Sequence, residues 1–99
     1  MPAYGHNIPT TFVITVVSGT GSKVAIINGK GMGVGVIPPT SVSVYDIDIS
    51  DNDSFVLVQS LGLTGTNTIE NNARYWNQHL ITIANASVDG DYKVKIWFE

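Results

Sequence analysis

Four aspartates form the densest acidic cluster in this sequence of 99 residues. Carboxylate oxygens are the ligands that hard cations such as calcium prefer, so Asp46, Asp48, Asp51 and Asp53 are the candidate metal ligands. The spacing differs from that of a calcium-binding EF-hand loop, because Asp51 stands where the turn glycine is needed and Leu57 replaces the closing glutamate. The alternative is a solvated strand edge whose charges discourage pairing with another strand. We expect no resident cofactor, with calcium as the alternative.

A second group combines aromatic and hydrogen-bonding side chains in one short stretch: Arg74, Tyr75, Trp76, Asn77, Gln78 and His79. Aromatic faces stack on sugar rings or anchor protein interfaces, and neighbouring polar groups orient the partner. The structural alternative places Trp76 over the hydrophobic core and Tyr75 in a loop. Trp97 is predicted to point away from the core. The candidate binding residues are therefore Arg74, Tyr75, Trp76, His79 and Trp97.

Nothing in the sequence identifies a catalytic centre. His6 and His79 are far apart in the sequence and have no cysteine or second histidine at metal-binding spacing, so surface positions are expected. There is no GxSxG nucleophile elbow, and without cysteine there is no thiolate chemistry or disulfide. The sequence predicts a protein that is not an enzyme.

Charge and hydropathy restrict the partners. Five basic residues and a net charge of −3 argue against a surface that follows nucleic-acid phosphates. No stretch reaches the ~18 apolar residues that cross a bilayer, so no membrane association is expected. The N-terminal residues lack the basic and apolar regions of a secretory signal. We therefore expect synthesis without a signal peptide and a location in a virion or extracellular particle, otherwise in the cytoplasm.

The elements that position these residues are strands. Charged residues make up only 13% of the chain, and Val, Ile, Thr, Ser, Asn and Gly dominate, which is typical of β-sheet proteins. The sequence predicts an all-β fold, a single antiparallel β-sandwich of about seven or eight strands with jelly-roll or Greek-key topology. Pro2 and Pro9 favour an extended arm over residues 1–10, followed by one sandwich domain over residues 11–99.

Turn signals divide the strands. Asn28-Gly29 and Asp89-Gly90 are typical of two-residue hairpins. The expected strands include residues 10–17, 23–27, 76–84 and 91–98. Between them, residues 61–72 read as a polar connection, and the spacing of Asn67, Glu70 and Arg74 predicts a short helical turn near 68–75.

Two strands have unusual patterns. Near Tyr45 the apolar alternation changes phase, which predicts a β-bulge or bend, and residues 55–58 are apolar at every position, as in a central strand covered on both faces. Gly31, Gly33 and Gly35 leave one strand face without side chains. Such a face accommodates an aromatic ring of the same chain, a ligand or another subunit.

Two families share features with the sequence. Pro38-Pro39, the alternating Val42 and Val44, Trp76 and the closing Val94, Ile96 and Trp97 resemble H-type lectins over residues 38–98. That resemblance implies a small six-stranded sandwich that trimerises and binds sugars between subunits. The sequence departs at Thr64-Gly65-Thr66, where the family has Thr-Gly-Phe, so no sugar-binding residue is carried over. The absent cysteine, the polar loops and the N-terminal arm also resemble small β-sandwich proteins of tailed-phage virions.

These observations give two hypotheses. The first is a non-enzymatic structural or assembly protein, a homo-oligomer that packs with itself and with other structural proteins in a virion, as a phage capsid, decoration or tail component, or in a similar extracellular particle. The alternative is a lectin-like carbohydrate-binding protein that uses Tyr75, Trp76 and the glycine face.

Overall fold

The computed structural model describes residues 8–99 and contains β-strands and connections. The strands are β1 (Thr10–Val16), β2 (Gly21–Ile26), β3 (Gly29–Ile37), β4 (Val44–Asp51), β5 (Val56–Thr64), β6 (Asn67–Glu70), β7 (Arg74–Tyr75), β8 (Gln78–Ala84) and β9 (Gly90–Phe98). Among these residues there is no helix that could cross a membrane. The all-β prediction is confirmed.

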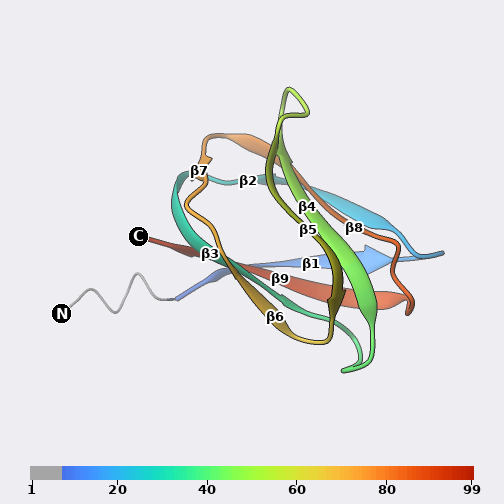
Figure 1. Cartoon of the computed structure of the whole chain (residues 1–99). Coiled ribbons are helices and arrows are strands. Elements are labelled where there is room, and N and C mark those ends of the chain that lie inside the picture. The colour runs from blue at the N-terminus through green and yellow to red at the C-terminus, as the bar shows by residue number, and fades with distance from the viewer. Residues whose placement is uncertain (1–7) are drawn as a thin grey trace.

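Two antiparallel sheets pack face to face (Figure 1). One has the strand order β1-β9-β3-β6, with the short β7 also paired to β3, and the other has the order β2-β8-β4-β5. The strands pair in nested fashion: β1 with β9, β2 with β8, β3 with β6 and β4 with β5. This nesting is a jelly roll, so the predicted sandwich and its topology are confirmed.

Both hairpin predictions are wrong for the same reason. The strands on either side of Asn28-Gly29, β2 and β3, belong to different sheets, and so do β8 and β9 on either side of Asp89-Gly90. The two glycines do have positive φ, 135° for Gly29 and 132° for Gly90. The turn residues reverse the chain direction, but at each turn the chain passes from one sheet to the other. Turn chemistry therefore fixed the corners without fixing which strands pair.

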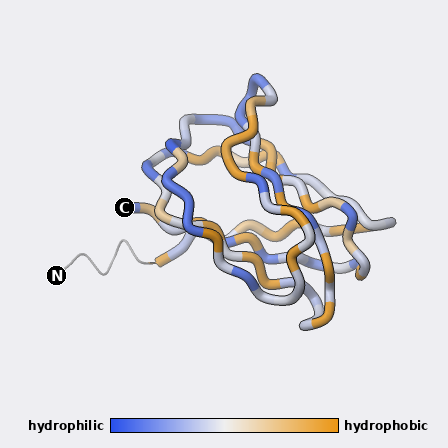
Figure 2. Tube along the Cα trace, in the orientation of Figure 1, coloured by the Kyte–Doolittle hydropathy of each residue, from blue (hydrophilic) through white to orange (hydrophobic). Residues whose placement is uncertain are grey.

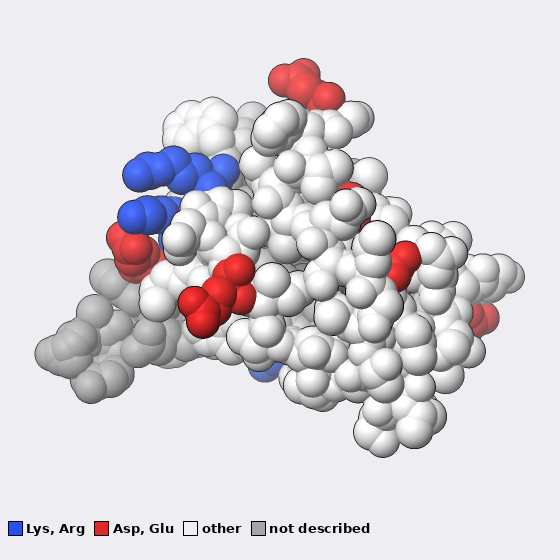
Figure 3. All heavy atoms as spheres, in the orientation of Figure 1, with Lys and Arg blue, Asp and Glu red and all other residues white. Residues whose placement is uncertain are grey.

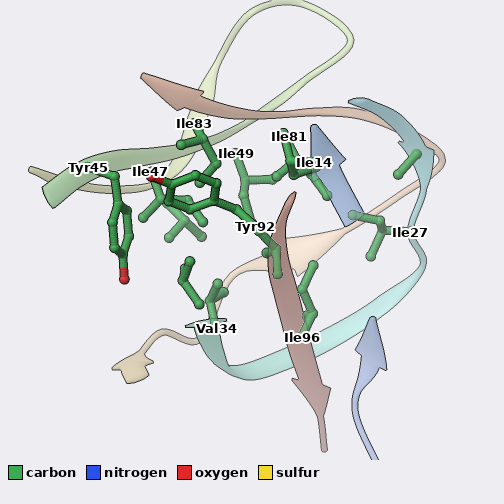
Figure 4. Packing of buried hydrophobic residues seen from close by; sticks show 14 of the residues in the cluster. Ile14, Ile27, Val34, Tyr45, Ile47, Ile49, Ile81, Ile83, Tyr92 and Ile96 are labelled. Atoms are coloured by element: carbon green, nitrogen blue, oxygen red, sulfur yellow. The ribbon is translucent and has the colours of Figure 1, made fainter. Parts of the chain in front are cut away.

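The core lies between the sheets. Figure 4 shows Tyr45, Ile47 and Ile49 of β4 facing side chains of the opposite sheet, among them Val34 and Ile96. Figure 2 shows the corresponding alternation of apolar and polar positions along the strands. Burying each of these isoleucines stabilises the fold by about 1.5–3 kcal/mol.

The predicted bulge is present, and its extra residue lies in the partner strand. Leu63 pairs with Tyr45 but Ser60 pairs with Ile47, so β5 carries one additional residue. Gly62 within this bulge has a φ of 66°, and its N–H donates to Asp46 Oδ1 at 2.8 Å. The core-facing residues Tyr45, Ile47 and Ile49 of β4 consequently stay in one unbroken alternation.

Residues 55–58 do not form a central strand. β5 is the last strand of its sheet, Phe55 lies before it with 65% of its surface exposed, and Val58 alone of the four is fully buried. The prediction of a strand covered on both faces is wrong, because a continuous apolar run does not distinguish a covered strand from an exposed edge.

The predicted helical turn near 68–75 is also wrong. Residues 61–64 extend β5, and the following residues form β6 and β7, which both pair with β3. The Asn67 amide donates to the carbonyl oxygens of Thr64 and Gly65 instead of capping a helix. Pairing with β3 thus overrides a weak local helix signal. Most of the predicted arm over residues 1–10, including His6, lies outside the described residues and stays a prediction.

One carboxylate joins two corners of the sandwich. Asp89, in the β8–β9 connection, accepts hydrogen bonds from the backbone N–H groups of Ser18 at 2.9 Å and Gly19 at 3.0 Å, in the β1–β2 turn. These bonds hold the pKa of the Asp89 carboxyl below its usual range.

We predict that Asp89→Asn lowers the melting temperature by a few degrees at neutral pH. A folded pKa below the unfolded value means that the Asp89 contribution is complete above about pH 4 and is lost as the pH falls through the folded pKa. Thermal melts of the variant and the parent should therefore converge at acid pH. Asp91→Asn is the control, because Asp91 accepts one side-chain hydrogen bond, from Thr15. An equal loss at every pH would contradict the assignment.

Candidate functional site

Two segments that are distant in the sequence meet at one end of the sandwich. β4 pairs with β8, and this register places Asp51 opposite His79. The turn after Asp51 therefore lies beside the residues that lead into β8. The acidic group and the aromatic group of the sequence analysis share this end of the molecule.

A cleft of about 330 Å³ opens between the two segments. It is lined by Asp51, Asn52, Asp53, Leu57, Arg74, Trp76, Asn77, Gln78 and His79. In Figure 3 the acidic β4–β5 turn projects at the top, and basic side chains lie at the side of the molecule where β7 runs. The cleft therefore combines an indole, amides, carboxylates and a guanidinium.

The pairing of β7 with β3 decides which aromatic side chain is available. Tyr75 lies opposite Gly29 and is 3% exposed, whereas Trp76, the next residue, is 80% exposed. The interpretation of Trp76 as a core cap with Tyr75 in a loop is wrong, since the two have opposite roles. The predicted strand over residues 76–84 begins two residues later, at Gln78, which leaves Trp76 outside the ladder.

The segment that carries Trp76 is held by a reciprocal contact. Asn77 has a φ of 67°, its N–H donates to Asn28 Oδ1 at 2.8 Å, and its carbonyl oxygen accepts from the Ile27 N–H at 2.8 Å. A non-glycine residue in the left-handed region is maintained only by such surrounding bonds. Trp76 is therefore presented from a fixed backbone.

The opposite wall is closed by Asp51. Its Oδ1 accepts from the N–H groups of Asp53 at 2.8 Å and Phe55 at 2.9 Å. Both bonds lie within the turn, so this carboxylate orders the wall of the cleft. The side chain of Asp53 stands on the ordered turn and lines the cleft.

His79 is not a surface residue, contrary to the prediction. It is 1% exposed, and its Nδ1 lies 2.9 Å from the carbonyl oxygen of Asn77. Because a carbonyl only accepts, Nδ1 carries a proton in this contact, which leaves Nε2 buried without a partner among the described residues. Its ring packs edge to face with Tyr75 at 5.4 Å between centroids. His79 thus forms the inner side of the cleft.

The four aspartates do not converge. Asp46 accepts from the Gly62 N–H and the Asn85 amide, and Asp48 accepts from the Gln59 amide at 3.4 Å. Both lie on the outward-facing side of β4, whereas Asp51 and Asp53 lie at the turn. Burial raises the pKa of the Asp48 carboxyl. Within residues 8–99 no three acidic or histidine side chains are close enough to hold a metal ion.

Aromatic rings of the same chain lie against Gly31 and Gly35, which was one of the alternatives, whereas a Cβ atom on Gly33 would meet only the carbonyl oxygen of Ile69. A Cβ atom on Gly31 would lie 2.8 Å from the Tyr75 ring, and one on Gly35 would lie 2.8 Å from the Trp97 ring. The prediction that the three glycines share one face is wrong, because a register shift pairs Gly31 with Phe98 and Gly33 with Trp97, which point to opposite faces of β9. Trp97 therefore lies outside the cleft, on the outer face of the β1-β9-β3-β6 sheet.

The sequence analysis did not assign Asn52 or Leu57 to a binding site, although both line the cleft. They precede the aromatic group by some twenty positions, and only the register between β4 and β8 brings them close. An alternation pattern identifies strands but contains no signal for that register.

No protein-family model and no curated protein matches the chain. Among solved structures, the carbohydrate-binding module CBM36 in complex with calcium and xylotriose aligns with a TM-score of 0.38 and 12% identity, over 86% of this chain and 74% of that chain. A structure of infectious bursal disease virus Gt strain aligns with a TM-score of 0.34 and 15% identity, over 90% of this chain and 32% of that chain. At these scores neither likeness carries an argument about function.

Two buried tyrosines provide a matched test of the core behind the cleft. The Tyr45 hydroxyl donates to Gly65 O at 2.7 Å, whereas the buried Tyr75 hydroxyl has no partner among the described residues, and burial raises its pKa to about 12. We predict that Tyr75→Phe raises the free energy of unfolding by about 1 kcal/mol and that Tyr45→Phe lowers it by about 1–2 kcal/mol. Denaturant titrations of both variants measure the difference. Equal losses would show that the Tyr75 hydroxyl is satisfied.

Proposed function

We propose that the protein is a non-catalytic carbohydrate-binding protein that uses the cleft between the β4–β5 turn and Trp76. The observation that supports this proposal most is the exposure of Trp76. Its indole is 80% exposed and lines the cleft together with hydrogen-bonding side chains. Tryptophan is enriched at binding interfaces, where its large apolar face contacts the partner.

The chemistry of the cleft fits a sugar ring. The apolar face of a pyranose stacks on an indole, while the amides of Asn77 and Gln78 and the carboxylate of Asp53 match ring hydroxyls. Arg74 adds a guanidinium at the same opening. Because Asp51 Oδ1 is committed to two backbone donors, we assign Asp51 a structural role and not that of an acid or base.

We predict that Trp76→Ala lowers the affinity for the glycan identified on a broad array by about 10-fold to 100-fold, because one aromatic contact contributes roughly 1–3 kcal/mol. The variant should keep the melting temperature of the parent, since the side chain is exposed. Phe55→Ala is the matched control, because Phe55 is an exposed aromatic residue that does not line the cleft. Equal effects of the two variants, or an array without any bound glycan, would refute the proposal.

A second candidate function, assembly of many copies in a virion or similar particle, is favoured by a different surface. Four residues form a row across the outer face of the β2-β8-β4-β5 sheet. Val24 pairs with Leu80, Leu80 pairs with Ser50, and Ser50 pairs with Val56. Val24 is 60% exposed, and Ile26 beside it is also exposed. A hollow of about 190 Å³ lies between Val24, Ser50 and Leu80 of this row and the residues Asp51, Asn52, Gln78 and His79, which also line the cleft. Contiguous apolar surface of this kind is typical of protein contacts.

For the assembly function we predict that the unmodified protein forms oligomers and that the double variant Val24→Lys with Ile26→Lys is a monomer. Lysines on an exposed edge strand disfavour association without disturbing the core. Light scattering at several concentrations measures the native mass. Val13→Lys, at an exposed position in β1 of the other sheet, should leave the mass unchanged. A parent protein that is monomeric at every concentration would exclude this role.

A further inference from the structure

A second groove lies on the outer face of the β1-β9-β3-β6 sheet. It has a volume of about 180 Å³ and is lined by Met32, Gly33, Thr68, Ile69, Glu70 and Trp97. None of these residues lines the cleft at Trp76. The chain contains two tryptophans, and each one borders a different surface opening.

The strand register explains the shape of the groove. Gly33 lies opposite both Trp97 of β9 and Glu70 of β6, and Gly35 lies opposite both Lys95 and Thr68. Residues that pair directly point to the same face of a sheet, so Gly33 forms a floor between Trp97 and Glu70, and Gly35 lies under the Trp97 ring. The floor is two strand spacings wide, about 10 Å.

The glycine floor also sets the position of the indole. The Cζ3 and Cη2 atoms of Trp97 would lie 2.8 Å and 2.9 Å from a Cβ atom on Gly35. The ring can therefore rest against the sheet with one face covered by backbone and the rest of its surface half-buried. Thr68 and Glu70 are exposed on β6, across the floor from the ring. An apolar ring face with a hydroxyl and a carboxylate opposite it is again the chemistry that a pyranose requires.

The groove is connected to the cleft by a short stretch of chain. Glu70 borders the groove and Arg74 borders the cleft. Arg74 follows Glu70 by four positions, so their Cα atoms are at most ~14 Å apart. In Figure 3 the acidic side chain over β6 and the acidic β4–β5 turn are visible on the same side of the molecule. One oligosaccharide can therefore reach both places.

We propose that the Trp97 groove is a second pyranose-binding site, and that one oligosaccharide occupies both this groove and the Trp76 cleft. The inference rests on the proposed carbohydrate function for its ligand class. Two linked contacts on one ligand increase avidity by about 10²–10⁴-fold over either contact alone. The groove would thus select chains over single sugars.

The test is a nitrogen-15 NMR titration of the full chain with cellohexaose, mannohexaose, laminarihexaose and chitohexaose. The two indole N–H resonances are assigned with Trp76→Phe and Trp97→Phe. We expect one of these hexasaccharides to shift both resonances. Gly35→Ala should weaken its binding at least tenfold, because the methyl group displaces the ring, while the Trp76 resonance still responds. The ring end is half-exposed and can move, so the variant should fold.

Two further variants keep the inference testable if Gly35→Ala is unstable. Glu70→Gln and Thr68→Ala remove single polar contacts from an exposed strand and should each weaken binding roughly fivefold. Thr11→Ala is the matched control, because Thr11 lies on the same outer face, opposite Lys95, and does not line the groove.

The outcomes separate the two sites. A hexasaccharide that shifts the Trp76 resonance alone overturns the groove inference and supports the proposed function. A shift of the Trp97 resonance alone supports the groove as a binding site and overturns both the shared ligand and the role of Trp76. If none of the four hexasaccharides shifts either resonance, both proposals are wrong.

Discussion

The pairing of β4 with β8 is the contact on which the rest of the structure depends. It joins the β4–β5 hairpin to the remainder of its sheet, and it lines up Ile47 with Ile83 and Ile49 with Ile81, all four fully buried. The same register places Asp51 opposite His79. The core and the cleft are thus fixed by one ladder, and a slip of one residue would turn the isoleucines to solvent and separate the walls of the cleft.

Much of the fold could be predicted because alternation reports directly on burial. Along β9, Tyr92, Val94 and Ile96 face the core while Trp97 faces outward, as the pattern indicated. What could not be predicted was the choice of partner. Asn28-Gly29 is a strong hairpin signal in local terms, yet β2 and β3 separate into different sheets, where β2 pairs with β8 and β3 lies between β9 and β6.

In the candidate site, too, the residues could be predicted from the sequence but their spatial neighbours could not. Its residue types were visible in the sequence, since Arg74 and Trp76 stood out by composition and Asp51 and Asp53 by charge. The sequence assigns the aspartates to a candidate metal site and the aromatic group to a candidate binding site. Only the pairing of β4 with β8 shows that the two groups line the same cleft. Tyr75 and His79 were grouped with the exposed residues, although the pairing of β7 with β3 directs the Tyr75 ring inward and the His79 ring packs against it.

The nested strand order has a consequence for biosynthesis. β9, which follows the other eight strands in the sequence, lies between β1 and β3, and β8 lies between β2 and β4. Until β8 and β9 have been synthesised, β1 and β2 have no partner strand, and β3 and β4 each keep one backbone edge unpaired. The sandwich therefore closes only after β8 and β9 have been synthesised, and a chain that terminates before them exposes strand edges of the kind that aggregate.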